Sequence, residues 1–158
     1  MGRATIERLY QAFARLDGAA MQACYADDAR FDDEVFALHG AREIGAMWTL
    51  LCDNVRASEA ARAAWRLTTH DLADDRVRWE VHYLFGPQAR PVHNVIDARF
   101  EFDARGRITR HRDRFDFWRW SRQALGAPGA LLGWTPWLRA KVRRQAARTL
   151  QRQLAKTA

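Results

Sequence analysis

The stretch Val77-Arg-Trp-Glu-Val-His-Tyr-Leu-Phe85 decides the fold class of this 158-residue chain. Apolar side chains alternate in it with Arg78, Glu80 and His82, which is the period of a β-strand with two different faces. The pair Asp74-Asp75 precedes the stretch and Gly86-Pro87 follows it, and both are typical of turns. The alternation therefore predicts a long strand between two hairpin turns.

Other strands and helices are predicted on both sides of this stretch. Strands are expected over about 63–70, 91–102 and 107–118, where the period of two continues. Before them, apolar residues recur at helical spacing over about 3–16, near 21–25 and after His39-Gly40. Residues 27–33 predict a turn that leads into a short strand. Helices followed by consecutive long strands indicate an α+β fold with the helices on one face of an antiparallel sheet.

The positive charge of the chain is confined to its C-terminal part. Residues 119–158 contain nine Lys and Arg and no Asp or Glu, whereas residues 1–118 contain 17 basic and 19 acidic residues. We therefore predict a domain over residues 1–120 and a tail over 121–158, made of an aromatic segment and a basic amphipathic helix. The domain itself is not basic, so nucleic acid is not expected as a partner.

The tail allows three interpretations. Its basic helix carries Val142, Leu150 and Leu154 on one side, and packing on its own domain or on a partner subunit is the favoured interpretation. The aromatic segment before the helix would then close a pocket as a lid. Contact with an anionic membrane surface comes second, and nucleic-acid binding comes last.

The cysteines and the N-terminal residues bear on the compartment. Cys24 and Cys52 lack a CxxC spacing and predict buried free thiols. The first residues carry charge where a secretory leader would be apolar, and the longest apolar runs are too short to cross a membrane. These features predict a cytoplasmic protein.

Two segments resemble families of known fold. The segment Ala26-Asp-Asp-Ala-Arg-Phe-Asp-Asp33 is similar to the one after the second helix of ketosteroid isomerases. The segment Gly106-Arg-Ile-Thr-Arg-His-Arg-Asp-Arg-Phe-Asp116 is similar to the last strand of limonene epoxide hydrolases and SnoaL-type polyketide cyclases. Together with the order of helices and strands, they make residues 3–120 resemble the nuclear transport factor 2-like superfamily. The resemblance implies a cone-shaped, curved antiparallel sheet wrapped on the N-terminal helices around a pocket, with the tail as an extra basic helix.

The resemblance also implies catalytic residues. Limonene epoxide hydrolases have an Arg-x-Asp pair at the position of Arg78-Trp-Glu80 and a catalytic Asp at the position of Asp113. By that resemblance Asp113 deprotonates water, Glu80 protonates the opening ring oxygen, and Arg78 separates the pKa values of the two carboxylates. Asp33 corresponds to the general base of ketosteroid isomerases.

Neither active site is complete in this sequence. Phe31 and Asp33 stand where the epoxide hydrolases place water with a Tyr and an Asn, and Leu9 and Ala98 stand where the isomerases have oxyanion donors. We therefore expect cofactor-free acid/base catalysis of the isomerase, cyclase or hydrolase type on a hydrophobic, oxygenated molecule. The alternative is a non-catalytic ligand-binding or dimerisation module of the same fold.

Two assignments of the faces of strand 77–85 remain open at this point. The resemblance places Arg78, Glu80 and His82 in the concave pocket and the apolar side chains on the convex face, through which a homodimer is expected. The alternative makes the apolar face the core and leaves the three polar residues as a solvated ladder of charges.

Further ligand contacts are expected from the other strands. His111 shares a strand face with Asp113, and apolar pocket walls are predicted from Phe31, Ile96, Phe115 and Trp120. His82, His93 and His111 lie on three different strands without an HxH or HxxxH spacing. No metal site and no cofactor are therefore predicted.

Overall fold

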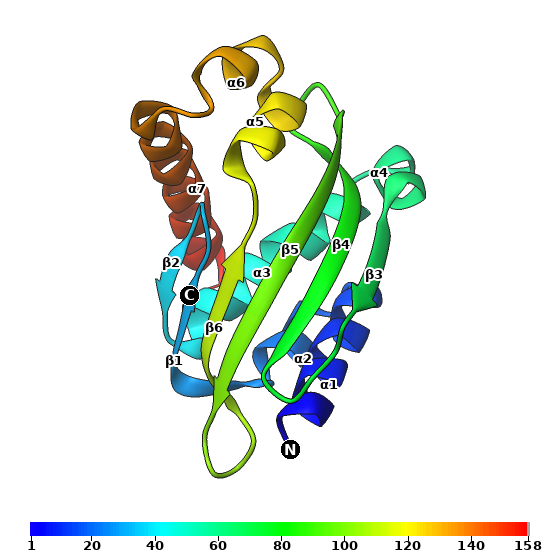
Figure 1. The fold of residues 1–158 in the computed structure, drawn as a ribbon, viewed down its shortest axis with the longest axis vertical. Helices are drawn as coiled ribbons and strands as arrows, with labels where there is room; N and C mark the ends of the chain where they lie inside the picture. Colours follow the sequence, from blue (N-terminus) through cyan, green and yellow to red (C-terminus); the bar gives the residue numbers. More distant parts are fainter. Residues whose placement is uncertain (158) are drawn as a thin grey trace.

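The computed structural model describes residues 1–157 and confirms the α+β fold, with helices packed on one face of a six-stranded sheet (Figure 1). The helices are α1 (Gly2–Ala14), α2 (Gly18–Gln22), α3 (Ala41–Arg56), α4 (Glu59–Ala64), α5 (Phe117–Leu125), α6 (Ala127–Leu132) and α7 (Pro136–Lys156). The strands are β1 (Tyr25–Asp32), β2 (Ala37–His39), β3 (Arg66–His70), β4 (Arg76–Phe85), β5 (Arg90–Phe102) and β6 (Ile108–Arg114).

The strand order is β2-β1-β6-β5-β4-β3, and the sheet is mixed. Strands β3 to β6 form an antiparallel meander, as expected for strands that follow each other through short turns. Strand β1 pairs antiparallel with β2 but parallel with β6, which corrects the prediction of a purely antiparallel sheet. No hairpin joins β1 to β6, so the chain connection does not fix their relative direction.

Two predicted boundaries differ from the observed ones for local reasons. Residues 27–33 were expected as a turn, but most of them belong to β1, in which Ala29 and Phe31 are buried. The last strand ends at Arg114 instead of near residue 118. The side chain of Asp116 accepts a hydrogen bond from the backbone N–H of Arg119 and caps α5, so the chain turns helical at Phe117.

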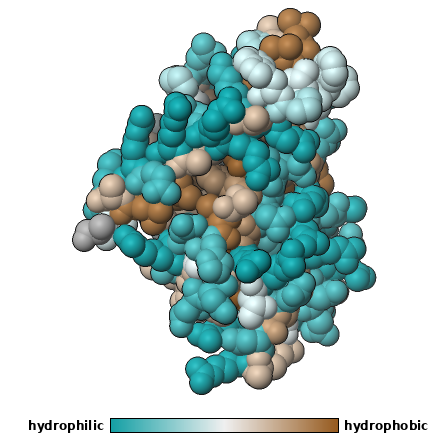
Figure 2. All heavy atoms as spheres, turned by 90° about the vertical axis from the view of Figure 1, so that its left-hand side faces the viewer, coloured by the Kyte–Doolittle hydropathy of each residue, from teal (hydrophilic) through white to brown (hydrophobic). Residues whose placement is uncertain are grey.

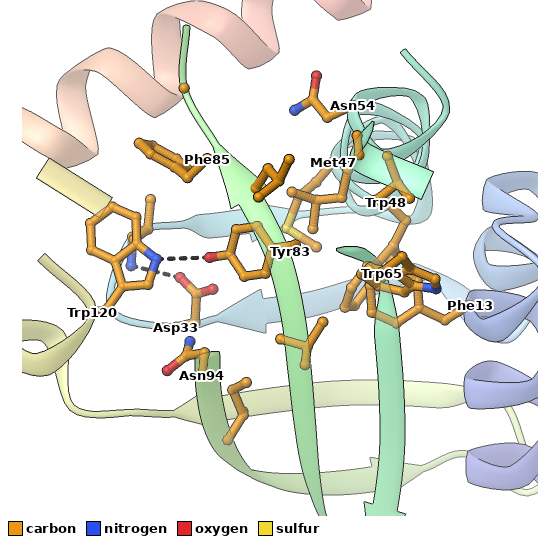
Figure 3. A pocket seen from close by; sticks show the side chains of 18 of the residues that line it. Phe13, Asp33, Met47, Trp48, Asn54, Trp65, Tyr83, Phe85, Asn94 and Trp120 are labelled. Carbon is orange, nitrogen blue, oxygen red and sulfur yellow. Dashed lines mark hydrogen bonds between the residues drawn. The ribbon is translucent and has the colours of Figure 1, made fainter. Parts of the chain in front are cut away.

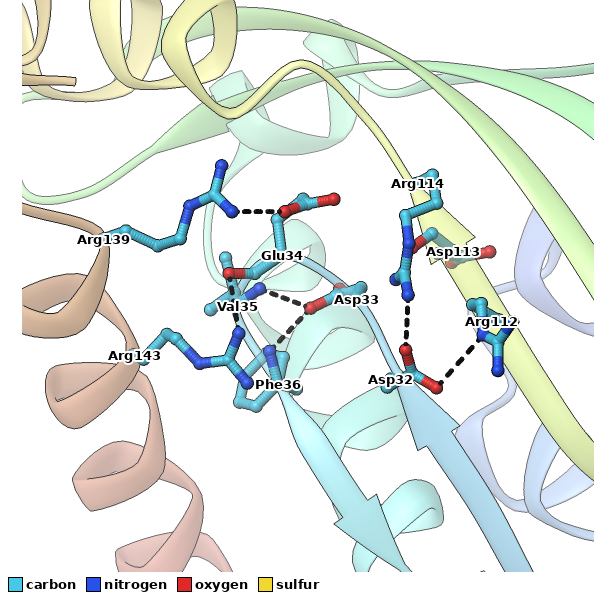
Figure 4. A network of polar contacts seen from close by, with 10 residues as sticks. All are labelled: Asp32, Asp33, Glu34, Val35, Phe36, Arg112, Asp113, Arg114, Arg139 and Arg143. Carbon is cyan, nitrogen blue, oxygen red and sulfur yellow. Dashed lines mark hydrogen bonds and ion pairs between the residues drawn. The ribbon is translucent and has the colours of Figure 1, made fainter. Parts of the chain in front are cut away.

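The basic tail packs on the rest of the chain. Helix α7 contacts α3, and its residues Leu138 and Leu150 are buried. Two of its arginines bind the segment between β1 and β2, since Arg139 lies 3.1 Å from the carboxylate of Glu34 and Arg143 donates to the Glu34 carbonyl (Figure 4). The favoured interpretation of the tail as a packed helix is therefore confirmed.

Cys24 and Cys52 are buried free thiols, as predicted. Among the described residues, none of the helices combines the length and the apolar character that a membrane crossing requires.

Candidate functional site

A cavity of about 470 Å³ lies between the inner face of the sheet, α3, α4 and the start of α5 (Figure 3). Most of its wall is apolar and aromatic, whereas its polar side chains are few. The polar groups deep in the wall are Asp33, Tyr83, Asn94 and Asp113, and the aromatic ones include Phe13, Phe31, Trp48, Trp65, Trp79, Phe85, Phe115 and Trp120. Such a wall suits a hydrophobic molecule with a few oxygen atoms.

The structure brings most of the predicted site residues to this cavity. Asp33 and Asp113 line it, and so do the predicted wall residues Phe31, Ile96, Phe115 and Trp120. His111 lies behind the wall, fully buried, with its ring next to Asp113.

Arg78, Glu80 and His82 do not reach the cavity, which corrects their predicted placement. They point to the outer face of the sheet, where Arg78 pairs with Asp97 at 2.9 Å. The strand register explains this, because directly paired residues of antiparallel strands point to the same side. Trp79 pairs with Ile96, and since Ile96 faces the cavity, Trp79 must face it as well.

The same register places the apolar face of β4 inside the molecule instead of on a convex surface. Val77, Trp79 and Val81 are buried within the chain. The outer face of the sheet carries charged side chains, including Arg78, Asp97 and Arg99. The predicted convex apolar surface for a homodimer is therefore not formed by these residues.

Asp113 ends a buried chain of hydrogen bonds that starts on α3. Trp48 Nε1 donates to Tyr25 Oη over 3.0 Å, Tyr25 Oη lies 2.8 Å from His111 Nδ1, and His111 Nε2 lies 2.9 Å from Asp113 Oδ1. All these side chains are buried. These hydrogen bonds run from α3 through β1 to β6, so three elements determine where the Asp113 carboxylate points.

The proton positions along this chain follow from its one fixed donor. The Trp48 indole can only donate, so Tyr25 Oη accepts from it and keeps its own proton for His111 Nδ1. A neutral His111 then carries its proton on Nε2 and donates it to the Asp113 carboxylate. This hydrogen bond from His111 orients the Asp113 side chain at the cavity wall.

Asp33 is the second carboxyl group of the cavity and has a different environment. Burial raises its pKa to about 7, and the negative charge of Asp113 adds to this, against the N–H groups of Val35 and Phe36 that lower it. Both N–H groups donate to Asp33 Oδ1 over 2.6 Å (Figure 4). Near neutral pH, a substantial fraction of Asp33 therefore carries a proton.

Arg112 and Arg114 flank Asp113 in sequence, but their side chains point to the opposite face of the sheet. Asp32, next to Asp33, binds Arg114 at 2.8 Å and Arg112 at 3.7 Å on the outer face of the sheet (Figure 4). Alternation along β1 and β6 sends these charges outward and Asp113 inward. Among the residues that the structure describes, no Lys or Arg lines the cavity, so its carboxyl groups have no cationic partner there.

Tyr83 supplies a neutral donor to the cavity. Trp120 Nε1 donates to Tyr83 Oη over 2.8 Å, which leaves the Tyr83 proton free for another acceptor (Figure 3). Burial raises the pKa of Tyr83 to about 12, so the hydroxyl stays protonated. Sequence reasoning missed this role because it assigned Tyr83 to the opposite face of β4.

The comparisons with known proteins agree with this architecture. The family model of the SnoaL-like domain matches residues 6–111. Among curated proteins, no sequence match was found.

Three solved structures have a similar fold. An epoxide hydrolase from Mycobacterium tuberculosis, described as like limonene epoxide hydrolase, is 22% identical with a TM-score of 0.56, over 83% of this chain and 94% of that one. A protein from Xanthomonas campestris, provisionally named a polyketide cyclase, is 21% identical with a TM-score of 0.54, over 77% and 94%. A nuclear transport factor 2-like protein of unknown function from Burkholderia pseudomallei is 19% identical with a TM-score of 0.57, over 78% and 98%.

These structures share the fold of this chain, and the family match covers more than half of its length. We conclude that the chain belongs to the SnoaL-like family.

Proposed function

We propose that this protein is a cofactor-free acid/base catalyst of the isomerase, cyclase or hydrolase type, acting on a small hydrophobic and oxygenated molecule. One observation carries the proposal: two carboxyl groups in different environments line one mostly apolar cavity. A pair of groups that differ in protonation near neutral pH supplies a base and an acid at the same time.

Asp113 acts as the general base in this proposal. Its carboxylate removes a proton from a carbon next to a carbonyl group, or from a water molecule, and His111 holds it in position. Protonated Asp33 gives its proton to the substrate oxygen that gains negative charge, and the Tyr83 hydroxyl donates a hydrogen bond to the ligand. Asp113 then gives the proton that it removed to the product or to water, and Asp33 takes a proton back from the enol oxygen of the substrate or from water, so both carboxyl groups return to their starting forms.

Further properties belong to the same proposal. The free buried thiols support a cytoplasmic location. A homodimer through the outer face of the sheet would be held by its charged side chains, since the apolar face is buried within each chain. The alternative of a non-catalytic binding module uses the same cavity without proton transfer.

The pH dependence of turnover tests the roles of the two carboxyl groups. The acid step requires protonated Asp33, so kcat/KM should fall as the pH rises through about 7. In Asp33→Asn this fall should disappear, because the amide cannot titrate, and the remaining activity should be lower at every pH. The rates would be measured with styrene oxide, a β,γ-unsaturated cyclic ketone and a polyketone that cyclises by aldol addition. A fall near pH 7 that persists in Asp33→Asn would contradict the assignment.

A further inference from the structure

Glu80, His82 and His93 converge on the outer face of the sheet, away from the cavity. His82 of β4 pairs directly with His93 of β5, and their rings stack in parallel with centroids 4.2 Å apart. Glu80 lies two residues before His82 and so shares its face. One ligand atom from each of the three lies within 4.8 Å of the others.

We propose that Glu80, His82 and His93 form a zinc-binding site, with His70 or water as the fourth ligand. Imidazole nitrogens and a carboxylate oxygen are ligands that Zn²⁺ prefers, at bond lengths of about 2.0–2.2 Å. Ligand atoms of a tetrahedral site are then about 3.3 Å apart. Glu80 Oε2 lies 3.1 Å from His93 Nε2, and Glu80 Oε1 lies 3.4 Å from His70 Nε2, so these contacts already have the required spacing.

Some charged groups around the cluster favour the binding of a cation, and others oppose it. The Glu80 carboxylate, which lies 3.1 Å from His93 Nε2, supplies the negative group that favours a cation. Two positive charges oppose the cation. The Arg119 guanidinium lies 3.4 Å from His93 Nδ1, and Arg66 of β3 is the strand partner of His82. In the zinc-bound form His93 Nδ1 carries the proton, and the exposed Arg119 side chain turns to solvent.

Zinc titration of the metal-free protein by calorimetry tests this site. Binding of one Zn²⁺ is expected, and His82→Ala or His93→Ala should weaken it by at least about 10-fold. Cobalt should give the absorption bands of a tetrahedral complex, and Arg119→Gln should tighten binding because it removes a positive charge. The matched control is His39→Ala, an exposed histidine on the far edge strand of the same sheet.

Two results would overturn the zinc site. One is the absence of Zn²⁺ binding to the unaltered protein, and the other is a loss in His39→Ala as large as in His82→Ala. The side chains of this cluster reach solvent, so the variants should keep their circular dichroism spectra and remain interpretable. The test measures metal binding alone and does not depend on whether the cavity turns over a substrate.

A second inference rests on a different surface, the corner formed by α5, α6 and the start of α7. In the described part of the chain, five of the six exposed large hydrophobic side chains lie here: Trp118, Leu131, Leu132, Trp134 and Trp137, with Leu131 72% and Trp134 69% exposed. We call them the corner surface. Figure 2 shows a small group of hydrophobic atoms at the top of the molecule, beside pale ones, where Figure 1 places α6.

We infer that the corner surface docks on an anionic lipid membrane. The indole N–H groups of Trp118 and Trp134 donate to backbone carbonyls of Ala130 and Leu131, so the rings are held in place while they face solvent. Arg122 lies over Trp118 and Lys141 over Trp137, and residues 119–158 contain no acidic side chain. Exposed tryptophan and leucine surrounded by cations match the interface of an anionic bilayer.

Co-sedimentation with vesicles tests the corner surface. Binding to vesicles that contain phosphatidylglycerol is expected, with little binding to pure phosphatidylcholine and loss at high salt. The double variant Leu131→Ala/Trp134→Ala and the variant Lys141→Glu should each bind at least about 10-fold more weakly. Arg42→Glu, a charge reversal on the distant helix α3, is the matched control and should bind almost as well.

Other occupants of this surface would appear as different results. If the unaltered protein does not sediment with phosphatidylglycerol vesicles, the membrane inference is wrong. It is also wrong if the double variant retains vesicle binding but changes a dimer into a monomer, because the surface would then join two copies of the chain.

Discussion

Asp113→Asn should retain ligand binding and lose turnover by about 10²–10⁴-fold, the usual contribution of a positioned general base. The substitution keeps the shape of the side chain, and the amide oxygen can still accept the proton of His111 Nε2 at the observed 2.9 Å. Only the ability to take a proton is removed. Steady-state rates would be combined with displacement of an apolar fluorescent dye from the cavity.

The dye measurement separates catalysis from simple binding. If the unaltered protein and Asp113→Asn turn over a substrate at the same rate, Asp113 is not the base. If both bind ligands and neither turns over any member of the substrate panel, the non-catalytic binding module is the better description. Phe115→Leu is a suitable control, since it changes an apolar wall residue and leaves both carboxyl groups in place.

His111→Leu should lower the free energy of unfolding by about 3–5 kcal/mol, because it leaves a buried carboxylate without a partner. Leucine leaves the Asp113 carboxylate without its donor and the Tyr25 hydroxyl without its acceptor, both in buried positions. It also removes the ring that packs on Phe31 and Phe100. Urea unfolding measures the loss, and His39→Leu on an exposed strand should change the stability little.

A double variant separates the unpaired charge from the lost packing. His111→Leu/Asp113→Leu should be less destabilised than the sum of the two single variants, because no uncompensated carboxylate remains. Strict additivity would mean that the pair does not interact in the folded protein.

Local patterns predicted the elements of this fold well. The alternation over residues 77–85 and the helical spacing over 3–16 correspond to β4 and α1. Such patterns depend only on neighbours in sequence. Asp116 shows their limit, because one capping side chain turned a predicted strand end into the first turn of α5.

The candidate site was harder to predict, because it depends on which face of the sheet points inward. Alternation separates Arg78, Glu80 and His82 from Val77, Trp79 and Val81 without saying which set is inside. The pairing of Trp79 with Ile96 decides the question, and register between strands cannot be read from either strand alone. The hydrogen bonds from Trp48 through Tyr25 to His111 join residues of three different elements, so no spacing in the sequence indicates them.

No metal site was predicted at His82 and His93, for the same reason. Motif searches look for ligands at fixed separations within one segment, whereas these two meet across a hairpin. Once the register of β4 and β5 is known, the pair and Glu80 follow from alternation.

The parallel pairing of β1 with β6 has a consequence for how the protein acquires its site. Asp33 follows β1 and Asp113 lies in β6, so the two acids that line the cavity come from distant parts of the sequence. Contacts between distant parts of a chain require closing a long loop and tend to form late in folding. A nascent chain would therefore complete its helices and hairpins first and bring the two acids together only in the final step.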